Sequence, residues 1–201
     1  MNQKIQKILE NIPDKSEDKG TTSLKFKEEL CEWIIENEDL FKNKIAIELG
    51  TCLGYSTRIL SSLFKKVITF DHNVTKVTSA KQLNSDRTNI DYMIGDIYSS
   101  PWWDTIEEDV GLVLVDADHS FKAIIKDIEN CMKLPSDGKI VLVFDDIGAF
   151  PDVKRAVDGT IWSGDLKKVK HIGLPPNTEY KHGNFLTDFE GCILLHEVSQ
   201  Q

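Results

Sequence analysis

Hydrophobic residues follow two kinds of pattern along this chain, and their alternation predicts the fold class. Five short runs are apolar almost throughout and rich in β-branched residues: KIAIEL, KVITFD, IDYMIG, GLVLVD and KIVLVFDD. Such runs are typical of strands that are covered on both faces. Between them, residues 55–64, 74–85 and 121–132 carry apolar side chains at helical spacing. Strand and helix in alternation predict right-handed βαβ units and a parallel sheet.

Both ends of the chain add further elements to this pattern. A short opening helix and a second helix over about 24–38 are expected, joined by a polar arm that ends at residue 22. Another helix is expected to start near Pro151. Two more strands, about 166–172 and 191–198, flank a stretch at 173–184 that is a candidate lid loop. Residues 99–109 have no clear pattern.

These elements predict one α/β domain over residues 1–201, because a chain of this length builds a single core. We expect a Rossmann-like, doubly wound sheet of seven strands. The sheet should be mostly parallel, with an antiparallel edge strand where the last two strands pair.

Each of the five buried runs delivers a carboxylate at its C-terminal end. In open α/β sheets these ends share one edge, and ligands bind there in the crevice where the strand order reverses. One such acid is commonly a helix N-cap, but each helix uses only one cap, so a series needs another reason. Successive positions lie 20 to 29 residues apart, about one strand-helix-strand unit: Glu48, Asp71, Asp96, Asp116 and the pair Asp145 and Asp146.

The turn after the first run indicates the class of ligand. The stretch ELGTCLGYST has glycines at Gly50 and Gly54, whereas a dinucleotide site has the pattern G-x-G-x-x-G. Cys52 stands where a second glycine would let a pyrophosphate approach the backbone, which disfavours NAD. Asp71, about 20 residues on, suits a carboxylate that accepts from ribose hydroxyls. A nucleoside without a pyrophosphate that carries a positive charge near acids describes S-adenosylmethionine.

The motifs IAIELGTCLGYST, VITFDHN, IGDI, LVDADHSF and IVLVFDD resemble, in this order, those of class I S-adenosylmethionine-dependent O-methyltransferases. They are most similar to the small metal-dependent group that includes catechol and macrolide-sugar O-methyltransferases. The resemblance covers about residues 21–159 and implies a cofactor site. In it, Asp71 would hold the ribose, and Thr22 and Ser23 weakly match a segment that reaches the cofactor's carboxylate. The implied cofactor-binding residues are Glu48, Gly50, Thr51, Gly54, Ser56, Asp71, Asp96, Ile97 and Asp116, with Asp96 and Ile97 beside the adenine.

The same resemblance implies a metal site at Asp116, Asp145 and Asp146. Hard carboxylates without an adjacent thiolate favour Mg²⁺, or Mn²⁺ or Ca²⁺, over zinc. Two neighbouring acids repel one another unless they are solvated or bridged by a cation. A plainer alternative stays open, in which Asp146 caps a turn and Asp145 is only solvated.

His119, three residues after Asp116, matches the position that is a His in the macrolide-sugar type and a Lys in the catechol type. A neutral imidazole can take a proton near neutral pH, so His119 is the candidate catalytic base, acting with Asp116. Its alternative role is a local hydrogen bond at a helix start. The implied reaction is an in-line displacement in which an oriented acceptor oxygen attacks the sulfonium methyl group.

The acceptor is the least determined part of this prediction. A sugar, a phenol and a natural-product intermediate all fit a small-molecule O-methyltransferase. Four aromatic residues are candidates for an acceptor wall, although aromatic side chains are more often plain core: Trp102, Trp103, Phe150 and Trp162.

Composition limits the partners. The net charge is −9 and no Lys/Arg run supplies a basic face, which argues against nucleic acid. Neither a signal peptide nor a membrane span is apparent, so we expect a cytoplasmic protein that binds no membrane. The four cysteines have no paired spacing and are expected to be free thiols. A homodimer is compatible with this class of protein.

Three rival functions stay open at this point. An NAD-dependent oxidoreductase would use the same sheet but needs the missing glycine-rich turn. A non-catalytic S-adenosylmethionine-binding or scaffold protein would keep the cofactor turn without a convergent catalytic site. An acidic interaction module would bind no small ligand.

Overall fold

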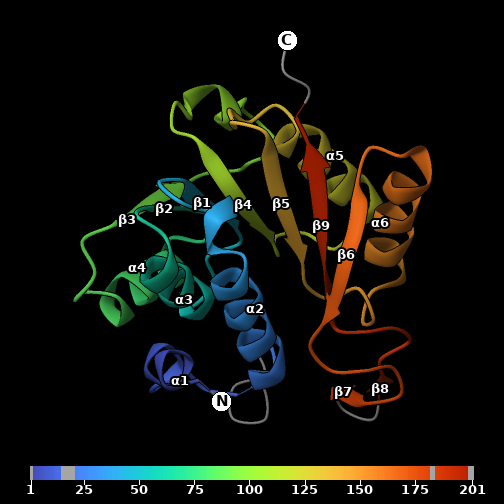
Figure 1. Ribbon diagram of the computed structural model, residues 1–201, viewed down its shortest axis with the longest axis horizontal. Helices are drawn as coiled ribbons and strands as arrows, with labels where there is room; N and C mark the ends of the chain where they lie inside the picture. The colour runs from blue at the N-terminus through green and yellow to red at the C-terminus, as the bar shows by residue number, and fades with distance from the viewer. Residues whose placement is uncertain (1, 15–20, 182–183, 199–201) are drawn as a thin grey trace.

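A seven-stranded sheet forms the centre of the computed structural model, which describes residues 2–14, 21–181 and 184–198. The strand order is β3-β2-β1-β4-β5-β9-β6 (Figure 1). The strands are β1 (Ile45–Leu49), β2 (Val67–Asp71), β3 (Ile90–Ile94), β4 (Val110–Val115), β5 (Lys139–Phe144), β6 (Lys167–Ile172) and β9 (Gly191–Glu197). This arrangement confirms the predicted Rossmann-like sheet.

The five predicted βα strands, β1 to β5, run parallel to one another. Strand β9 is antiparallel both to β5 and to the edge strand β6. The last two predicted strands therefore pair as expected and close one side of the sheet. The predicted loop at 173–184 contains a two-stranded ribbon of β7 (Glu179–Lys181) and β8 (Asn184–Phe185).

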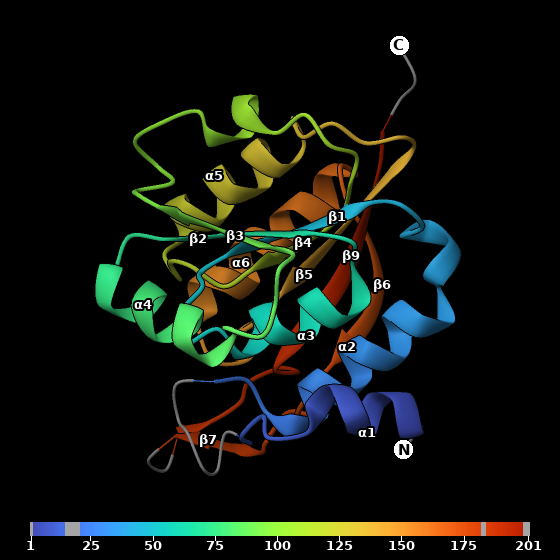
Figure 2. The same cartoon turned by 90° about the vertical axis from the view of Figure 1, so that its left-hand side faces the viewer.

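In the described part of the chain, six helices surround this sheet in two layers, and Figure 2 shows α1 to α4 on one side of it and α5 on the other. All five helices predicted after the opening helix are present. The helices are α1 (Gln3–Leu9), α2 (Leu24–Glu36), α3 (Tyr55–Leu63), α4 (Val74–Leu83), α5 (Phe121–Cys131) and α6 (Pro151–Ser163), with short 3₁₀ turns at η1 (Glu38–Leu40) and η2 (Trp102–Thr105). Residues 15–20 of the predicted polar arm lie outside the described residues.

The apolar runs bury alternate side chains in two core clusters. Ile47 and Val113 pack in the cluster that also contains residues of α5 and α6. Ala46 and Leu112 point the other way, into the cluster formed with α2 and α3. Because strand side chains alternate between faces, a run that is apolar throughout serves both layers.

Strand β3 was expected to be buried on both faces, but its residues are partly or fully exposed. Met93 and Ile94 are 43% and 51% exposed. The reason is position, because β3 is an edge strand and pairs only with β2. Among the described residues, no helix is long and apolar enough to cross a membrane.

The order of the strands reverses between β1 and β4. The chain runs from β1 through β2 to β3 on one side, and from β4 to β5 on the other. This reversal separates the loops that follow β1 and β4 and opens a crevice at the C-terminal edge of the sheet.

Candidate active site

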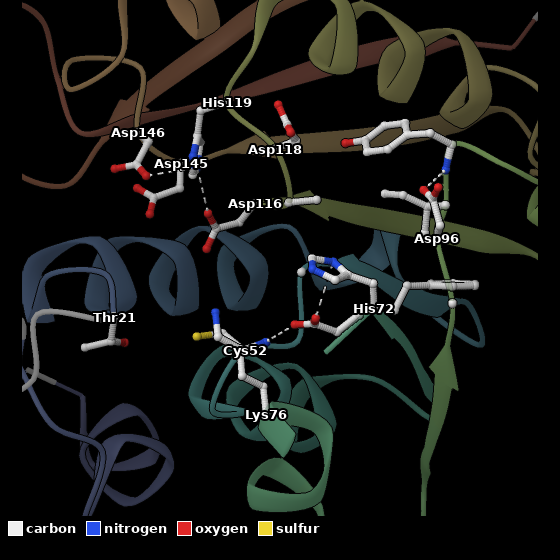
Figure 3. A pocket seen from close by; sticks show the side chains of 17 residues that line it. Thr21, Cys52, His72, Lys76, Asp96, Asp116, Asp118, His119, Asp145 and Asp146 are labelled. Carbon is white, nitrogen blue, oxygen red and sulfur yellow. Dashed lines mark hydrogen bonds and ion pairs between the residues drawn. The ribbon is translucent and has the colours of Figure 1, made fainter. Parts of the chain in front are cut away.

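A cavity of about 630 Å³ lies at the crevice, and residues from the ends of all five parallel strands line it. Figure 3 shows the labelled side chains facing this space from different parts of the chain. The most frequent lining residue is aspartate, at Asp71, Asp96, Asp116, Asp118, Asp145 and Asp146. The acids that the sequence distributes along the chain therefore meet at one site, with the exception of Glu48.

The turn after β1 forms one wall through Gly50 and Cys52. Gly50 has φ +103°, and a Cβ atom there would lie 1.9 Å from the carbonyl oxygen of Asp116. Only glycine lets the loops after β1 and β4 approach so closely. Cys52 has φ 45°, a left-handed conformation, and its N–H donates to Asp71 Oδ2 at 2.9 Å. The turn is thus built around Asp71.

Asp71 ends β2 and holds its carboxylate at the cavity. Its Oδ1 accepts from the Asn73 N–H at 2.8 Å, while its Oδ2 accepts from Cys52. Each carboxylate oxygen can accept more than one hydrogen bond, so both keep capacity for a ligand hydroxyl. His72 and Lys76 line the cavity nearby.

The loop after β3 supplies a mixed wall of apolar and acidic groups. Ile97 is buried, whereas Asp96 is exposed, and its Oδ1 accepts from the N–H of Tyr98 at 2.8 Å. Tyr98 follows at the cavity edge. An apolar surface next to a free carboxylate face suits a flat ring that bears an amino group.

Asp116, His119 and Asp146 converge on one point of the cavity (Figure 3). His119 Nε2 lies 3.4 Å from Asp116 Oδ1 and 3.1 Å from Asp146 Oδ2. Asp146 directs its carboxylate there from a left-handed residue with φ 61°, a conformation that aspartate tolerates better than most side chains. The ends of β4 and β5 thereby contribute to a single cluster.

The imidazole of His119 is fixed in plane and polarised by its neighbours. Phe150 stacks on it with ring centroids 4.4 Å apart and an angle of 8° between planes. Burial alone would lower the pKa of His119, but the hydrogen bonds and charges of Asp116 and Asp146 outweigh it and raise this pKa to about 10. The two carboxylates therefore keep His119 protonated near neutral pH unless a bound cation offsets their charge.

The same cluster fits a divalent cation. One donor atom each from Asp116, His119 and Asp146 lies within 4.8 Å of the others. Asp145, the remaining predicted ligand, is 5% exposed and lines the same cavity, but it is not part of this three-residue group. Two to three carboxylates with one imidazole form a donor set that hard and borderline divalent ions accept.

Glu48 occupies a different environment from the other acids. It is fully buried within β1 and is not among the residues that line the cavity. Its Oε2 accepts from Thr57 and Thr69, with the Thr69 contact at 2.6 Å. Burial raises the pKa of Glu48 to about 8, against the lowering effect of these two hydrogen bonds. The structure thus assigns Glu48 to the support of the first turn.

Three further predicted cofactor residues are not among those that line the cavity. Thr51 is buried and shares a hydrogen bond with Thr69 at 2.6 Å. Gly54 caps α3 with φ 83°, and Ser56 lies in the first turn of that helix. The segment before α2 is shifted by one residue from expectation, because Thr21 lines the cavity while Ser23 caps α2 and bonds to Glu190.

The four aromatic residues proposed as an acceptor wall do not line this cavity. Trp102 packs in the core against Phe70, with ring centroids 4.9 Å apart. Trp162 is 91% exposed on α6. Phe150 touches the site indirectly, through its stack on His119.

Sequence patterns alone missed several lining residues. His72 and Tyr98 follow the predicted strand-end acids by one and two positions, so extension of each strand-end motif would have found them. No sequence motif marks Lys76 or Thr21 as a site residue. Lys76 lies on helix α4, and Thr21 lies at the end of the polar arm before α2.

Comparisons with known proteins agree with this geometry. The sequence matches the family described as a methyltransferase domain over residues 47–147, half of the chain. The matched segment runs from β1 to the turn after β5 and contains every aspartate that lines the cavity. No curated protein sequence matches the chain.

Solved structures with similar folds include two O-methyltransferases that align over nearly the whole chain. An O-methyltransferase from Bacillus cereus in complex with SAH has a TM-score of 0.65 and 14% identity, over 98% of this chain and 91% of that one. TomG from Streptomyces achromogenes, an O-methyltransferase involved in tomaymycin synthesis and solved with SAM, has a TM-score of 0.64 and 15% identity, over 99% and 91%.

A more distant match is fibrillarin from Aeropyrum pernix with bound S-adenosyl-L-methionine, at a TM-score of 0.56 and 15% identity, over 78% of this chain and 67% of that one. At these identities the likeness concerns the fold. The chemical class of the methyl acceptor depends on the residues of the site and not on the fold.

Proposed function

The chain belongs to the family of methyltransferase domains, and on this premise we propose that it is an S-adenosylmethionine-dependent O-methyltransferase acting on a small-molecule hydroxyl. The observation that carries the proposal is the convergence of six aspartates from four strand ends on one cavity of about 630 Å³. An acidic, partly enclosed space favours a substrate with a cationic sulfonium centre.

The methyl donor fits the wall formed by the loops after β1, β2 and β3. Asp71 would accept from the ribose hydroxyls, since both of its oxygens retain acceptor capacity. Gly50 would line the donor's site, and its missing side chain lets the loop at Asp116 approach that site. Asp96 beside Ile97 would meet the adenine ring and its amino group. The solved complexes of Bacillus cereus O-methyltransferase and TomG with SAH and SAM support this choice of donor.

A divalent cation, with Mg²⁺ as the first choice, is proposed at the opposite wall. Asp116, Asp145 and Asp146 would hold it, next to His119 Nε2. When bound, such a cation lowers the pKa of a neighbouring hydroxyl group. The convergence of Asp116, His119 and Asp146 supports the proposal, because one donor atom of each lies within 4.8 Å of the others.

The proposed reaction is a direct displacement. The acceptor oxygen attacks the methyl carbon, the carbon–sulfur bond breaks, and the sulfonium becomes a neutral thioether. A cation held by Asp116 and Asp146 would offset the charges that keep His119 protonated, and the neutral imidazole then takes the hydroxyl proton. Phe150 holds the ring plane in place during this transfer. Orientation of the two substrates supplies much of the acceleration.

Two alternatives fit the site less well. An NAD-dependent oxidoreductase would need room for a pyrophosphate at the first turn, where Cys52 stands instead of glycine. A non-catalytic S-adenosylmethionine-binding protein would not require His119 to lie against two carboxylates inside the cavity. A small-molecule acceptor is favoured by the enclosed cavity and by the net charge of −9, which repels nucleic acid.

A transfer assay with methyl-labelled S-adenosylmethionine tests the proposal. Incubation with Mg²⁺ and a panel of sugars, phenols and natural-product diols should yield a labelled ether from at least one acceptor. The product's mass should rise by one methyl group, and His119→Ala should reduce the yield. Absence of product across the panel, combined with absence of donor binding, would contradict the proposal.

A further inference from the structure

Tyr98 connects two walls of the cavity through a hydrogen bond to a buried acid. It belongs to the loop after β3, lines the cavity and is 37% exposed. Its hydroxyl donates to Asp127 Oδ2 at 3.1 Å. Asp127 lies on α5, the helix that begins directly after the loop that carries Asp116 and His119. One side chain thus joins the end of β3 to the element that follows β4.

Asp127 is unusual because its carboxyl group is fully buried. Within the described residues, Asp127 Oδ1 has no hydrogen-bond partner, and Asp127 Oδ2 accepts from the Tyr98 hydroxyl. A buried carboxyl group with so few partners destabilises a fold, and a packed helix would be more stable with an apolar residue there. The position of Asp127 is therefore better explained by what it does to Tyr98 than by helix stability.

Tyr98 also makes hydrogen bonds to residues other than Asp127. Its N–H donates to Asp96 Oδ1, which sets the direction of the loop. Burial and the charge of Asp127 raise the pKa of the Tyr98 hydroxyl, while a hydrogen bond from the main chain of Asp118 acts against them. The hydroxyl therefore meets both α5 and the loop at Asp118. A ring anchored in this way keeps a fixed distance between Asp96 and the opposite loop.

The surfaces next to the ring indicate which part of a ligand it serves. Phe70 and Ile97 give an apolar face, and the Asp96 carboxylate lies exposed at its edge. This combination suits a planar purine that presents an amino group. The cluster of Asp116, His119 and Asp146 contributes to a different wall of the cavity (Figure 3).

We infer that Tyr98, anchored on Asp127, is a positioning residue that sets the affinity for the purine nucleoside part of the methyl donor. The inference rests on the proposed function, because it concerns how that donor is held. Loss of the hydroxyl would leave the aromatic ring in place but free the loop after β3 to move. Donor binding should then weaken, while the reacting groups at His119 stay unchanged.

The test compares Tyr98→Phe and Asp127→Leu, which removes the acceptor at similar volume, with a matched control, Tyr92→Phe. Tyr92 lies on β3 six positions earlier, bonds through its hydroxyl to the Ala80 carbonyl at 3.3 Å, and does not line the cavity. Calorimetric titration with S-adenosylhomocysteine should show a Kd about tenfold higher for Tyr98→Phe and for Asp127→Leu, the size of a lost hydrogen bond between the Tyr98 hydroxyl and its anchor. Tyr92→Phe should stay within about twofold of the wild type.

A double variant and a kinetic readout separate positioning from general stability. Because Asp127 is proposed to act through the Tyr98 hydroxyl, Tyr98→Phe/Asp127→Leu should bind no more weakly than Tyr98→Phe alone. The KM for S-adenosylmethionine should rise about tenfold while kcat stays within about twofold, the pattern of lost binding rather than lost chemistry. A lower melting temperature with an unchanged Kd and KM would show a purely structural role and overturn the inference.

The outcomes also separate this inference from the proposed function. If the wild-type protein binds no S-adenosylhomocysteine, the proposed function and the inference both fail. If the wild type binds it and Tyr98→Phe binds it equally well, the inference alone fails. If Asp127→Leu does not fold, Tyr98→Phe still decides, because it removes a single hydroxyl oxygen and keeps the ring.

Discussion

Nε2 of His119 lies 3.1 Å from Oδ2 of Asp146, although the two residues belong to loops that follow different strands. The contact places the end of β5 against the start of α5 and closes one side of the cavity. It also places a proton acceptor beside a carboxylate that has a separate proposed role as a metal ligand. The chemistry proposed for the protein depends on this proximity.

Removal of the Asp146 charge should affect transfer strongly. We expect Asp146→Asn to lower kcat/KM by about 100-fold, because the variant loses a metal ligand and a partner of His119. Asp158→Asn on α6 is the control, since Asp158 pairs with Lys154 and does not line the cavity. Steady-state rates of both variants check the prediction. Equal rates for Asp146→Asn and the control would exclude Asp146 from the reaction.

Chelation should abolish activity reversibly. After treatment with EDTA and its removal by dialysis, transfer should fall to background, and added Mg²⁺ or Mn²⁺ should restore it. The melting temperature of the wild type should rise with added ion, because binding to the native state stabilises it, whereas that of Asp116→Asn should rise less. Activity that survives chelation would indicate an enzyme that needs no metal.

The close approach of the β1 and β4 loops should make Gly50 far less replaceable than a glycine of similar backbone conformation. Gly50 and Gly138 have φ +103° and +93°, but a Cβ at Gly138 meets no atom within 4 Å. We expect Gly138→Ala to cost about 1 kcal/mol of unfolding free energy. Gly50→Ala should cost at least about 3 kcal/mol, because the Asp116 backbone must move as well. Urea denaturation of both variants measures the difference.

Sequence patterns predicted most of the fold and the gathering of acids at one edge. Both follow from local rules: apolar runs with short spacing form strands, and the C-terminal ends of parallel strands share an edge. The aspartates at the ends of β2, β3, β4 and β5 were found for this reason. The exposure of Met93 was not predicted, because a run of apolar residues can form either a central strand or an edge strand.

Details within the site depended on side-chain packing. Glu48 lies one residue before the end of β1, whereas the other acids lie at or beyond the ends of their strands, and Thr57 and Thr69 bind it inside the core. The anchoring of Tyr98 on Asp127 joins residues 29 positions apart, and no local pattern indicates that contact. Tertiary contacts of this kind are determined by how the layers pack, which the sequence alone does not reveal.

Glu48 should make stability depend on pH. Burial raises its pKa from an ordinary 4.5 to about 8 in the folded protein. Between these values the unfolded chain releases the proton and the folded protein keeps it, so the unfolding free energy should fall as pH rises through this window. The slope should reach at most roughly 1.4 kcal/mol per pH unit. Glu48→Gln, which cannot titrate, should show a flatter profile in denaturation curves taken between pH 5 and 8. An identical fall in the variant would mean that another group is responsible.

Calorimetric titration of the wild-type protein decides whether the acidic cavity at the crevice binds S-adenosylmethionine. We expect saturable binding of S-adenosylmethionine and S-adenosylhomocysteine at one site per chain, weakened by Asp71→Asn, with no binding of NADH. Binding of NADH, or of neither methyl-donor ligand, would contradict it.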